Sequence, residues 1–191
     1  MCGRYTLNSS KTLEKKFNFK HKANFNIAPG SNVILIDQNQ KLITRLWGIK
    51  PKWNKGNPII NARFESYKTK ATFKSLSRCV FLTDGYYEWK KIGKNRIPFY
   101  HYIDDEFFFF AGLYNENECC ILTKESQIEN YNVHSRQPVC LSFDLKDEWL
   151  KNAHIKCFKK KINFHPVSLF VNSSKNNNIN LIRAIDNITH I

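Results

Sequence analysis

The sequence predicts a single α+β domain in which strands dominate and helices lie around them. Its 191 residues suffice for one domain with a real core. Short apolar stretches alternate with turn signals along much of the chain, which is typical of strands joined by turns. No internal repeat or linker divides residues 1–191, so we expect one folding unit over the whole length.

The first half of the chain is expected to form strands and short helices around one long loop. This loop, residues 47–61, has few periodic apolar residues, and its two tryptophans argue that it is ordered. The expected elements around it are a helix capped by Ser9-Ser10, an extended segment at 25–30 that ends in a Pro-Gly turn, hairpin strands at 33–36 and 42–47, a short helix at 71–76, and strands at 79–82 and 86–89.

The second half carries the strongest strand signals. Strands at 97–103, 107–113 and 119–122, separated by polar turns, are expected to form an antiparallel meander. Residues 107–110 are four phenylalanines, so the middle strand is expected to be covered on both faces. The remaining expected elements are a helix from Asp144 to Leu150, a strand at 167–171, a flexible Asn-rich loop at 172–180 and a short terminal helix.

The charge balance points to a polyanionic partner. Thirty basic residues against sixteen acidic ones give a net charge of +14, which favours nucleic acid as the first hypothesis. A composition biased toward Lys, Asn, Ile and Phe, without functional meaning, is the alternative. No apolar run approaches the length of a membrane span, so no membrane association is expected.

The six cysteines are expected to be free thiols. The stretch from Cys2 to Ser10 lacks the apolar segment of a secretory signal, which favours a reducing, cytoplasmic location. No Cys-x-x-Cys pair or close Cys/His cluster is present, so neither a metal site nor a cofactor is expected. We also expect a monomer.

The chain begins Met1-Cys2-Gly3-Arg4, and a Cys in second place can become the first residue once Met1 is removed. Cys2 would then carry an α-amine and a thiol, and this 1,2-aminothiol can condense with an aldehyde and close into a thiazolidine ring. Ordinary pKa values of about 7.7–8.0 for the amine and about 8.5 for the thiol leave some of each nucleophile near neutral pH. An incidental Cys at this position is the alternative.

Three further polar residues are candidates for catalysis: Asn61, Glu88 and His134. Glu88 lies between aromatic residues, and burial there would raise its pKa toward neutrality, which suits proton transfer; simple alternation would instead point it to water. His134 titrates in the working pH range and could donate to an oxygen of a reacting sugar, or it could be structural. Asn61 could orient a hydroxyl, or it could serve a turn.

Arginines and rigid apolar residues accompany these candidates. Three arginines each lie within two residues of a candidate catalytic group, and a guanidinium forks around phosphate oxygens. Two tryptophans and a proline could stack on bases or wedge beside an unpaired one, although core packing is the alternative for each aromatic residue. The expected DNA-binding set is therefore Arg4, Arg63, Arg136, Pro29, Trp53 and Trp89.

An ordered set of motifs resembles the SRAP (SOS response-associated peptidase) family. Each motif alone is weak, but the set follows the family's order from the first residue to near the last. The motifs are Met1-Cys2-Gly3-Arg4-Tyr5, Asn26-Ile27-Ala28-Pro29, Trp47-Gly48 with Pro51 and Trp53, Asn61-Ala62-Arg63 with Glu65, Arg78-Cys79, Asp84-Gly85-Tyr86-Tyr87-Glu88-Trp89, His134 with Arg136 and Pro138, His165-Pro166-Val167, and Val171-Asn172.

The resemblance implies one compact domain with a barrel-like antiparallel sheet and a basic groove for single-stranded DNA that contains abasic sites. It implies that Cys2 links covalently to the ring-opened aldehyde of an abasic site and that Asn61 holds the substrate or the amino terminus. Glu88 would shuttle protons, His134 would hydrogen-bond the sugar oxygen, and the arginines would bind phosphates.

The resemblance further implies that the protein shields abasic sites in the DNA damage response, in a bacterium near the nucleoid. It also implies a possible lyase side activity, by β-elimination from the Schiff base, and autoproteolytic removal of Met1.

Two other functions stay open at this point. A thiol peptidase would use Cys2 as nucleophile and His134 as base, and it would cleave other proteins. A non-catalytic single-strand binder would rest on arginines and aromatic residues alone. It would show salt-sensitive binding, no preference for abasic sites and no covalent product.

Overall fold

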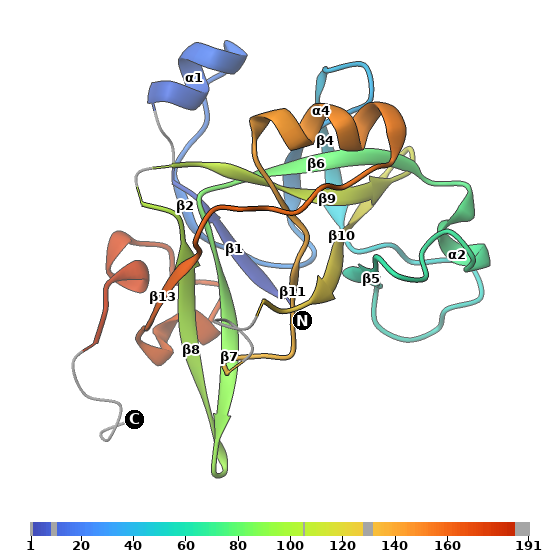
Figure 1. Cartoon of the computed structure of the whole chain (residues 1–191). Coiled ribbons are helices and arrows are strands. Elements are labelled where there is room, and N and C mark those ends of the chain that lie inside the picture. Colours follow the sequence, from blue (N-terminus) through green and yellow to red (C-terminus); the bar gives the residue numbers. More distant parts are fainter. Residues whose placement is uncertain (1, 9–10, 105, 128–131, 186–191) are drawn as a thin grey trace.

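Two β-sheets form the centre of the computed structural model, and helices lie outside them (Figure 1). The structure describes residues 2–8, 11–104, 106–127 and 132–185, and in the first helix the side chains from residue 14 onward. Strands dominate within these residues, so the predicted α+β class is confirmed.

The larger sheet closes on itself. It contains β3 (Asn32–Ile36), β4 (Leu42–Trp47), β6 (Ser77–Thr83), β9 (Phe108–Tyr114), β10 (Glu118–Glu125), β11 (Arg136–Pro138) and β12 (Cys140–Leu141), with β5 (Asn61–Arg63) added against β10. The pairings β10–β4, β4–β3, β3–β6, β6–β9 and β9–β10 form a ring, which agrees with the expected barrel-like sheet.

The ring is not purely antiparallel. β10 runs parallel to both β4 and β5. The long loop between those two strands carries the chain forward, so that β4 pairs with the start of β10 and β5 pairs with its middle. The loop predicted at 47–61 therefore connects β4 to β5, and both of these strands pair with β10 in parallel.

The smaller sheet is antiparallel and has the order β13-β8-β7-β1-β2. Its strands are β1 (Arg4–Leu7), β2 (Asn24–Ile27), β7 (Gly85–Ile92), β8 (Asn95–Tyr102) and β13 (Asn163–Pro166). Asp84 alone separates β6 from β7, so the chain passes directly from one sheet into the other. The β7–β8 hairpin extends away from the rest of the molecule at the bottom of Figure 1.

Helices cover the outside of the sheets. They are α1 (Lys11–Phe17), α2 (Ala71–Lys74), α4 (Phe143–Asn152) and the 3-10 turns η1 (Leu169–Asn172) and η2 (Ile179–Ile182). α4 lies across β6 and β9 (Figure 1), where Trp149 Nε1 donates to the Cys79 carbonyl at 2.9 Å. The residue that precedes this helix is Ser142, two residues before the expected cap at Asp144, which lies instead in the first turn. The cap expected at Ser9-Ser10 lies outside the described residues.

The central strand of phenylalanines is covered on both faces, as predicted. Phe108, Phe109 and Phe110 are buried. The Phe109 ring lies 5.0 Å from the ring of Phe143 on α4, whereas the Phe110 ring lies 5.9 Å from that of Tyr5 inside the ring of strands. Alternate side chains of β9 thus join α4 to the sheet and fill the barrel.

The predicted meander is wrong in its first pairing. β8 pairs with β7 and β13, whereas β9 pairs with β6 along seven residues of that strand. β10 and β12 take the other edge of β9, so no edge remains for β8. The strands themselves lie near their predicted positions.

Two predictions near the C-terminus also need correction. No strand runs over 167–171. Instead, β13 ends at Pro166 and η1 begins at Leu169, where the Ser168 side chain accepts from the backbone N–H of Phe170. The Asn-rich run expected to be a flexible loop is held to β2. The buried Asn26 amide donates to the carbonyls of Ser173 and Asn176, each at 2.9 Å. We call residues 169–182 the C-terminal strap.

Six free cysteines are present and only Cys157 is exposed. Among the described residues, every helix is too short or too polar to cross a membrane.

Candidate active site and DNA interface

Cys2 lies two residues before the start of β1 and is fully buried, with 0% of its surface exposed. The side-chain amide of Asn61 donates to its carbonyl oxygen at 2.8 Å, and its own Sγ lies 3.7 Å from the carbonyl of Arg4, to which it donates. Burial raises the pKa of the Cys2 thiol well above its ordinary value, and the nearby Glu88 carboxylate raises it further. In the chain that carries Met1, this thiol is therefore neutral and shielded.

Glu88 is buried on β7, with 3% of its surface exposed. Burial raises its pKa to about 7, because a carboxylate loses hydration there. The alternative in which Glu88 points to water is therefore wrong. Since side chains alternate along a strand, residues 86 and 88 share one face of β7 and residues 87 and 89 the other.

The face that carries Glu88 also carries Tyr86, which sequence reasoning did not single out. The hydroxyl of Tyr86 is buried and makes no hydrogen bond to a described residue. Burial raises the pKa of this phenol, and the charge of the Glu88 carboxylate acts on it in the same direction. The signal in the sequence was the alternation itself, which puts Tyr86 and Glu88 on one face of the strand.

Asn61 begins β5 and so does not serve a turn. It lies opposite Ile121 of β10, which fixes its backbone while its side chain reaches the Cys2 carbonyl. Its Oδ1 is buried and accepts no hydrogen bond within the described residues. The amide thus anchors the start of the chain through nitrogen and presents an acceptor oxygen beside it.

His134 lies two residues before β11. Its Nδ1 lies 3.0 Å from the backbone nitrogen of Arg136 and 3.1 Å from the carbonyl oxygen of the same residue, and burial lowers its pKa below the ordinary value. In the tautomer in which Nδ1 accepts from that N–H, the neutral ring carries its proton on Nε2, which is then a hydrogen-bond donor; in the other tautomer Nδ1 donates to the carbonyl.

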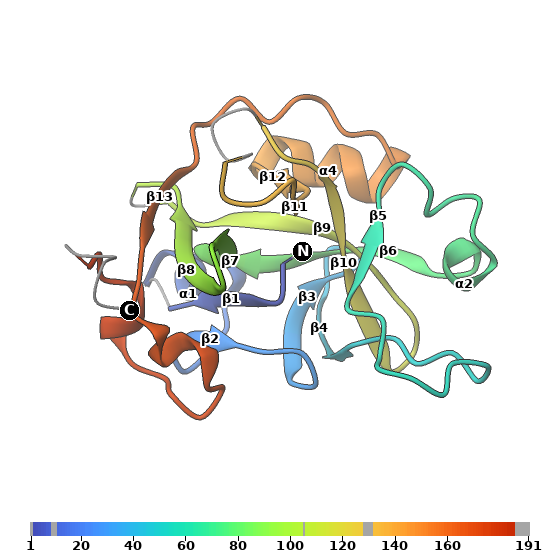
Figure 2. The ribbon, with the colours of Figure 1, turned by 90° about the horizontal axis from the view of Figure 1, so that it is seen from below.

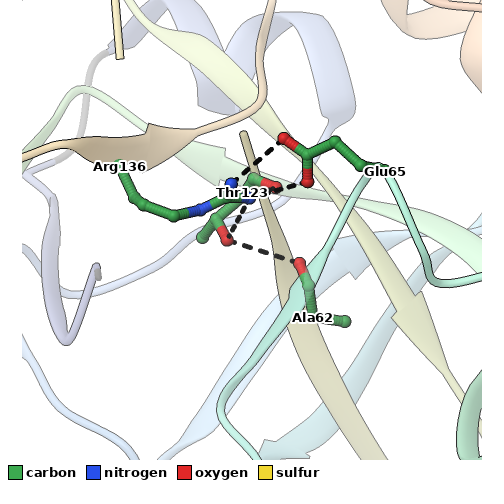
Figure 3. Close-up of polar contacts among 4 residues, drawn as sticks. All are labelled: Ala62, Glu65, Thr123 and Arg136. Carbon is green, nitrogen blue, oxygen red and sulfur yellow. Dashed lines mark hydrogen bonds and ion pairs between the residues drawn. The ribbon is translucent and has the colours of Figure 1, made fainter. Parts of the chain in front are cut away.

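Arg136 binds a carboxylate of the protein itself (Figure 3). Its two terminal nitrogens lie 3.1 and 2.9 Å from the carboxylate oxygens of Glu65, and Nη2 also donates to the Thr123 carbonyl at 2.5 Å. These hydrogen bonds hold the pKa of Glu65 below its ordinary value. Arg136, two residues after His134, therefore connects β11 and β10 to the segment that follows β5.

Arg4 and Trp89 contact the C-terminal strap. Nη1 of Arg4 donates to the Asn26 side chain and to the Val171 carbonyl, both at 2.7 Å, and Nη2 reaches the Asn172 carbonyl at 3.1 Å. Trp89 Nε1 donates to Oδ1 of Asn172 at 2.8 Å. The structure thus joins the start of β1, the middle of β7 and the strap around Asn172.

The other three residues of the expected DNA-binding set are more open. Trp53 is 68% exposed in the loop between β4 and β5, and Arg63 is exposed at the end of β5. Pro29 is half-buried in the turn after β2. An exposed tryptophan of this size is available for stacking on a base.

A cationic pocket lies beside His134. Its volume is about 340 Å³, and its walls include Trp89, Lys90, Lys91, Arg96 and His134. The lysines and Arg96 come from the β7–β8 hairpin and were not among the predicted site residues, although the Lys-rich turn at 90–96 was visible in the sequence. A larger pocket of about 680 Å³ lies beside Asp84 and Tyr102, and no predicted site residue lines it.

Comparisons with known proteins show which family the chain resembles. The sequence model of the family described as SOS response associated peptidase (SRAP) matches residues 1–174. Abasic site processing protein YoaM of Bacillus subtilis is 31% identical over 96% of this chain and 98% of its own length. Abasic site processing protein YedK of Escherichia coli is 31% identical over 84% of each chain.

A crystal structure of a protein from Bacteroides thetaiotaomicron has the same fold. It superposes with a TM-score of 0.80 at 18% identity and covers 96% of this chain and 100% of its own. The match of the family over most of the chain, together with relatives of similar length, leads to one conclusion: the chain belongs to the SOS response associated peptidase family.

Proposed function

We propose that this protein processes abasic sites in single-stranded DNA by linking covalently to them through Cys2 after Met1 is removed. The observation that carries the proposal is the meeting of three groups at the junction of the two sheets: Cys2, the Asn61 amide bound to its carbonyl, and the buried Glu88 carboxyl. The names of the relatives support the substrate. The product would shield the abasic site.

The chemistry begins at nitrogen. The α-amine of Cys2 attacks the C1 aldehyde of the ring-opened sugar, and the carbinolamine loses water to give a Schiff base. The thiol then adds to the imine carbon, its proton passes to the nitrogen, and a thiazolidine results with one water released overall. Glu88, with a pKa of about 7, is both acid and base near neutral pH, so it can protonate the leaving hydroxyl and later accept the thiol proton.

The raised pKa of the Cys2 thiol explains why the second step needs a base. A buried thiol does not ionise by itself, so the carboxylate of Glu88 has to take its proton as the ring closes. Asn61 holds the Cys2 carbonyl and so keeps the amine and thiol in place once Met1 is gone. Because Cys2 has no exposed surface in the chain with Met1, the proposal requires that processing opens it.

The DNA contacts divide into two groups. We assign direct contact to Arg63, Trp53 and Pro29, whose side chains are exposed or half-buried, and to His134, whose Nε2 would donate to the sugar oxygen. Arg4, Arg136 and Trp89 donate to protein atoms, so the proposal gives them first a positioning role beside the DNA. We further propose that the protein acts as a monomer.

A thiol peptidase is less well supported by this geometry. Cys2 Sγ donates to the Arg4 carbonyl rather than to an imidazole, and its pKa is raised, whereas a thiolate nucleophile needs a lowered one. Removal of Met1 by the protein itself and strand cleavage by β-elimination from the Schiff base remain parts of the proposal.

The test uses Cys2→Ala and an oligonucleotide with one abasic site. Wild type is expected to give a band that survives denaturation, and Cys2→Ala to give none, because an alanine lacks the sulfur that closes the ring. A stable tetrahydrofuran analogue of the abasic site is the control, since it has no aldehyde. A persistent band with Cys2→Ala, or an equal band with the analogue, would show that the nucleophile or the electrophile is wrong.

A further inference from the structure

We propose that the end of the β7–β8 hairpin is a phosphate-binding site that holds the DNA backbone next to the abasic nucleotide. The site consists of Lys90, Lys91, Lys94 and Arg96, which we call the hairpin cluster. This inference rests on the proposed function, because it assumes that the sugar at His134 belongs to a DNA strand.

The first observation is an unfavourable arrangement of charge. Lys91 and Arg96 lie directly opposite each other in the hairpin register, and Lys94 lies in the turn between them. Like charges in directly opposed positions destabilise a pair of strands. No acidic residue of the described chain forms an ion pair with any of the cluster. A bound anion would relieve this repulsion.

The second observation is the cationic pocket. Lys90, Lys91 and Arg96 line a volume of about 340 Å³ together with His134 and Trp89. Water occupies about 30 Å³ per molecule in the liquid, so the pocket has room for a phosphate with its sugar and solvent. The ammonium groups of the two lysines and the guanidinium of Arg96 therefore belong to its lining, and both kinds of donor commonly bind phosphate oxygens.

The third observation is that the pocket lies next to the candidate active site, because His134 lines it and Lys90 follows Glu88 on β7. Lys90 is two residues beyond Glu88 on the same strand and therefore on the same face. Val133, next to His134, is buried against Ile97 and Phe99 of β8, so the hairpin holds the loop that carries the imidazole. A phosphate in the pocket would thus lie at a fixed place relative to a sugar at His134.

The charge of the pocket comes from the cluster and not from the imidazole. Burial and the neighbouring cations favour the neutral form of His134, and Arg96 is among those cations. The pocket therefore separates two tasks: His134 donates one neutral hydrogen bond to the sugar, and the cluster attracts the anionic backbone.

The test compares two doubly substituted proteins of equal charge. Lys91→Gln with Arg96→Gln removes two cations of the cluster. Lys15→Gln with Lys151→Gln removes two exposed lysines from α1 and α4, which lie at the opposite end of the molecule from the hairpin (Figure 1). Binding to the tetrahydrofuran oligonucleotide is measured at several salt concentrations by fluorescence anisotropy.

The cluster variant is expected to lower the slope of log K against log salt by about 1.4, since each single-strand phosphate contact contributes about 0.7. The ratio of the wild-type binding constant to that of the cluster variant should then fall about sevenfold between 50 and 200 mM salt. The cluster variant should also need a higher DNA concentration for its half-maximal crosslinking rate. This concentration should change more than the crosslinking rate at saturating DNA. A slope equal to that of the α1/α4 control would overturn the inference.

A truncation series identifies the strand direction. Oligonucleotides shortened from the 5′ or the 3′ end should give different results. Shortening on one side should abolish the difference in salt slope between wild type and the cluster variant, and shortening on the other side should preserve that difference. A difference that survives both truncations would contradict a site for the flanking backbone. Failure of the proposed function would look different, because wild type would then form no covalent product while the salt slopes could still be compared.

Discussion

Glu88 is the residue whose environment most determines the chemistry. Its neighbours on β7 alternate between two faces, and the sequence alone could not tell which face is buried, because both carry aromatic residues. Both faces are in fact buried at this point: Glu88 lies toward Cys2, whereas Tyr87 and Trp89 donate to Phe25 and to the C-terminal strap. Residue types predicted the candidates, whereas the burial of both faces follows from long-range packing.

The pKa of Glu88 has a consequence for stability that Glu88→Gln measures. The folded-state pKa of about 7 exceeds the ordinary 4.5, so between these values the folded chain binds more protons than the unfolded one. The contribution of this group is therefore fully present below about pH 4.5 and lost as pH rises through 7. Relative to wild type, Glu88→Gln should gain stability from pH 5 to pH 8, by at most about 3 kcal/mol.

Urea denaturation at the two pH values checks this. If the difference in the free energy of unfolding between Glu88→Gln and wild type does not change with pH, the Glu88 carboxyl is not desolvated. The same substitution should slow crosslinking at pH 7 and flatten its pH dependence, because glutamine neither accepts nor releases a proton.

At the scale of elements, pairing was harder to predict than position. The three strands of the expected meander were placed correctly, yet β8 joined a different sheet from β9. The reason is the passage at Asp84 and Gly85, where a nearly continuous stretch leaves one sheet and enters the other without a turn long enough to recognise. Short strands such as β5 and β13 were missed because three or four residues carry little periodicity.

The passage between the sheets depends on the absence of a side chain at residue 85. A Cβ on Gly85 would lie 2.2 Å from Oη of Tyr100, a hydroxyl that also contacts Thr6 at 3.0 Å. Gly85→Ala should therefore destabilise the fold by about 1–3 kcal/mol through overpacking. Thermal denaturation measures this loss, with Gly56→Ala as a contrast, because the carbon added at residue 56 would meet only the Asn54 side chain, at 3.3 Å. Equal losses in the two variants would argue against the close approach.

At the scale of the whole molecule, the two sheets bring distant parts of the chain to one place. Residues 2, 61 and 88 come from three separate segments: Asn61 donates to the Cys2 carbonyl, and the Glu88 carboxylate acts on the Cys2 thiol. The motif order predicted the family and the fold class, whereas the mixed direction of the ring and the strap that holds Arg4 follow from long-range pairings. The net charge of +14 predicted a polyanion but not the hairpin that carries part of it.

Intact mass of the wild-type protein after incubation with an abasic oligonucleotide tests the central claim most directly. The account predicts a protein without Met1 whose mass has increased by that of the oligonucleotide less one water. A protein that retains Met1 and still carries the oligonucleotide, or one that loses Met1 and gains nothing, would contradict it.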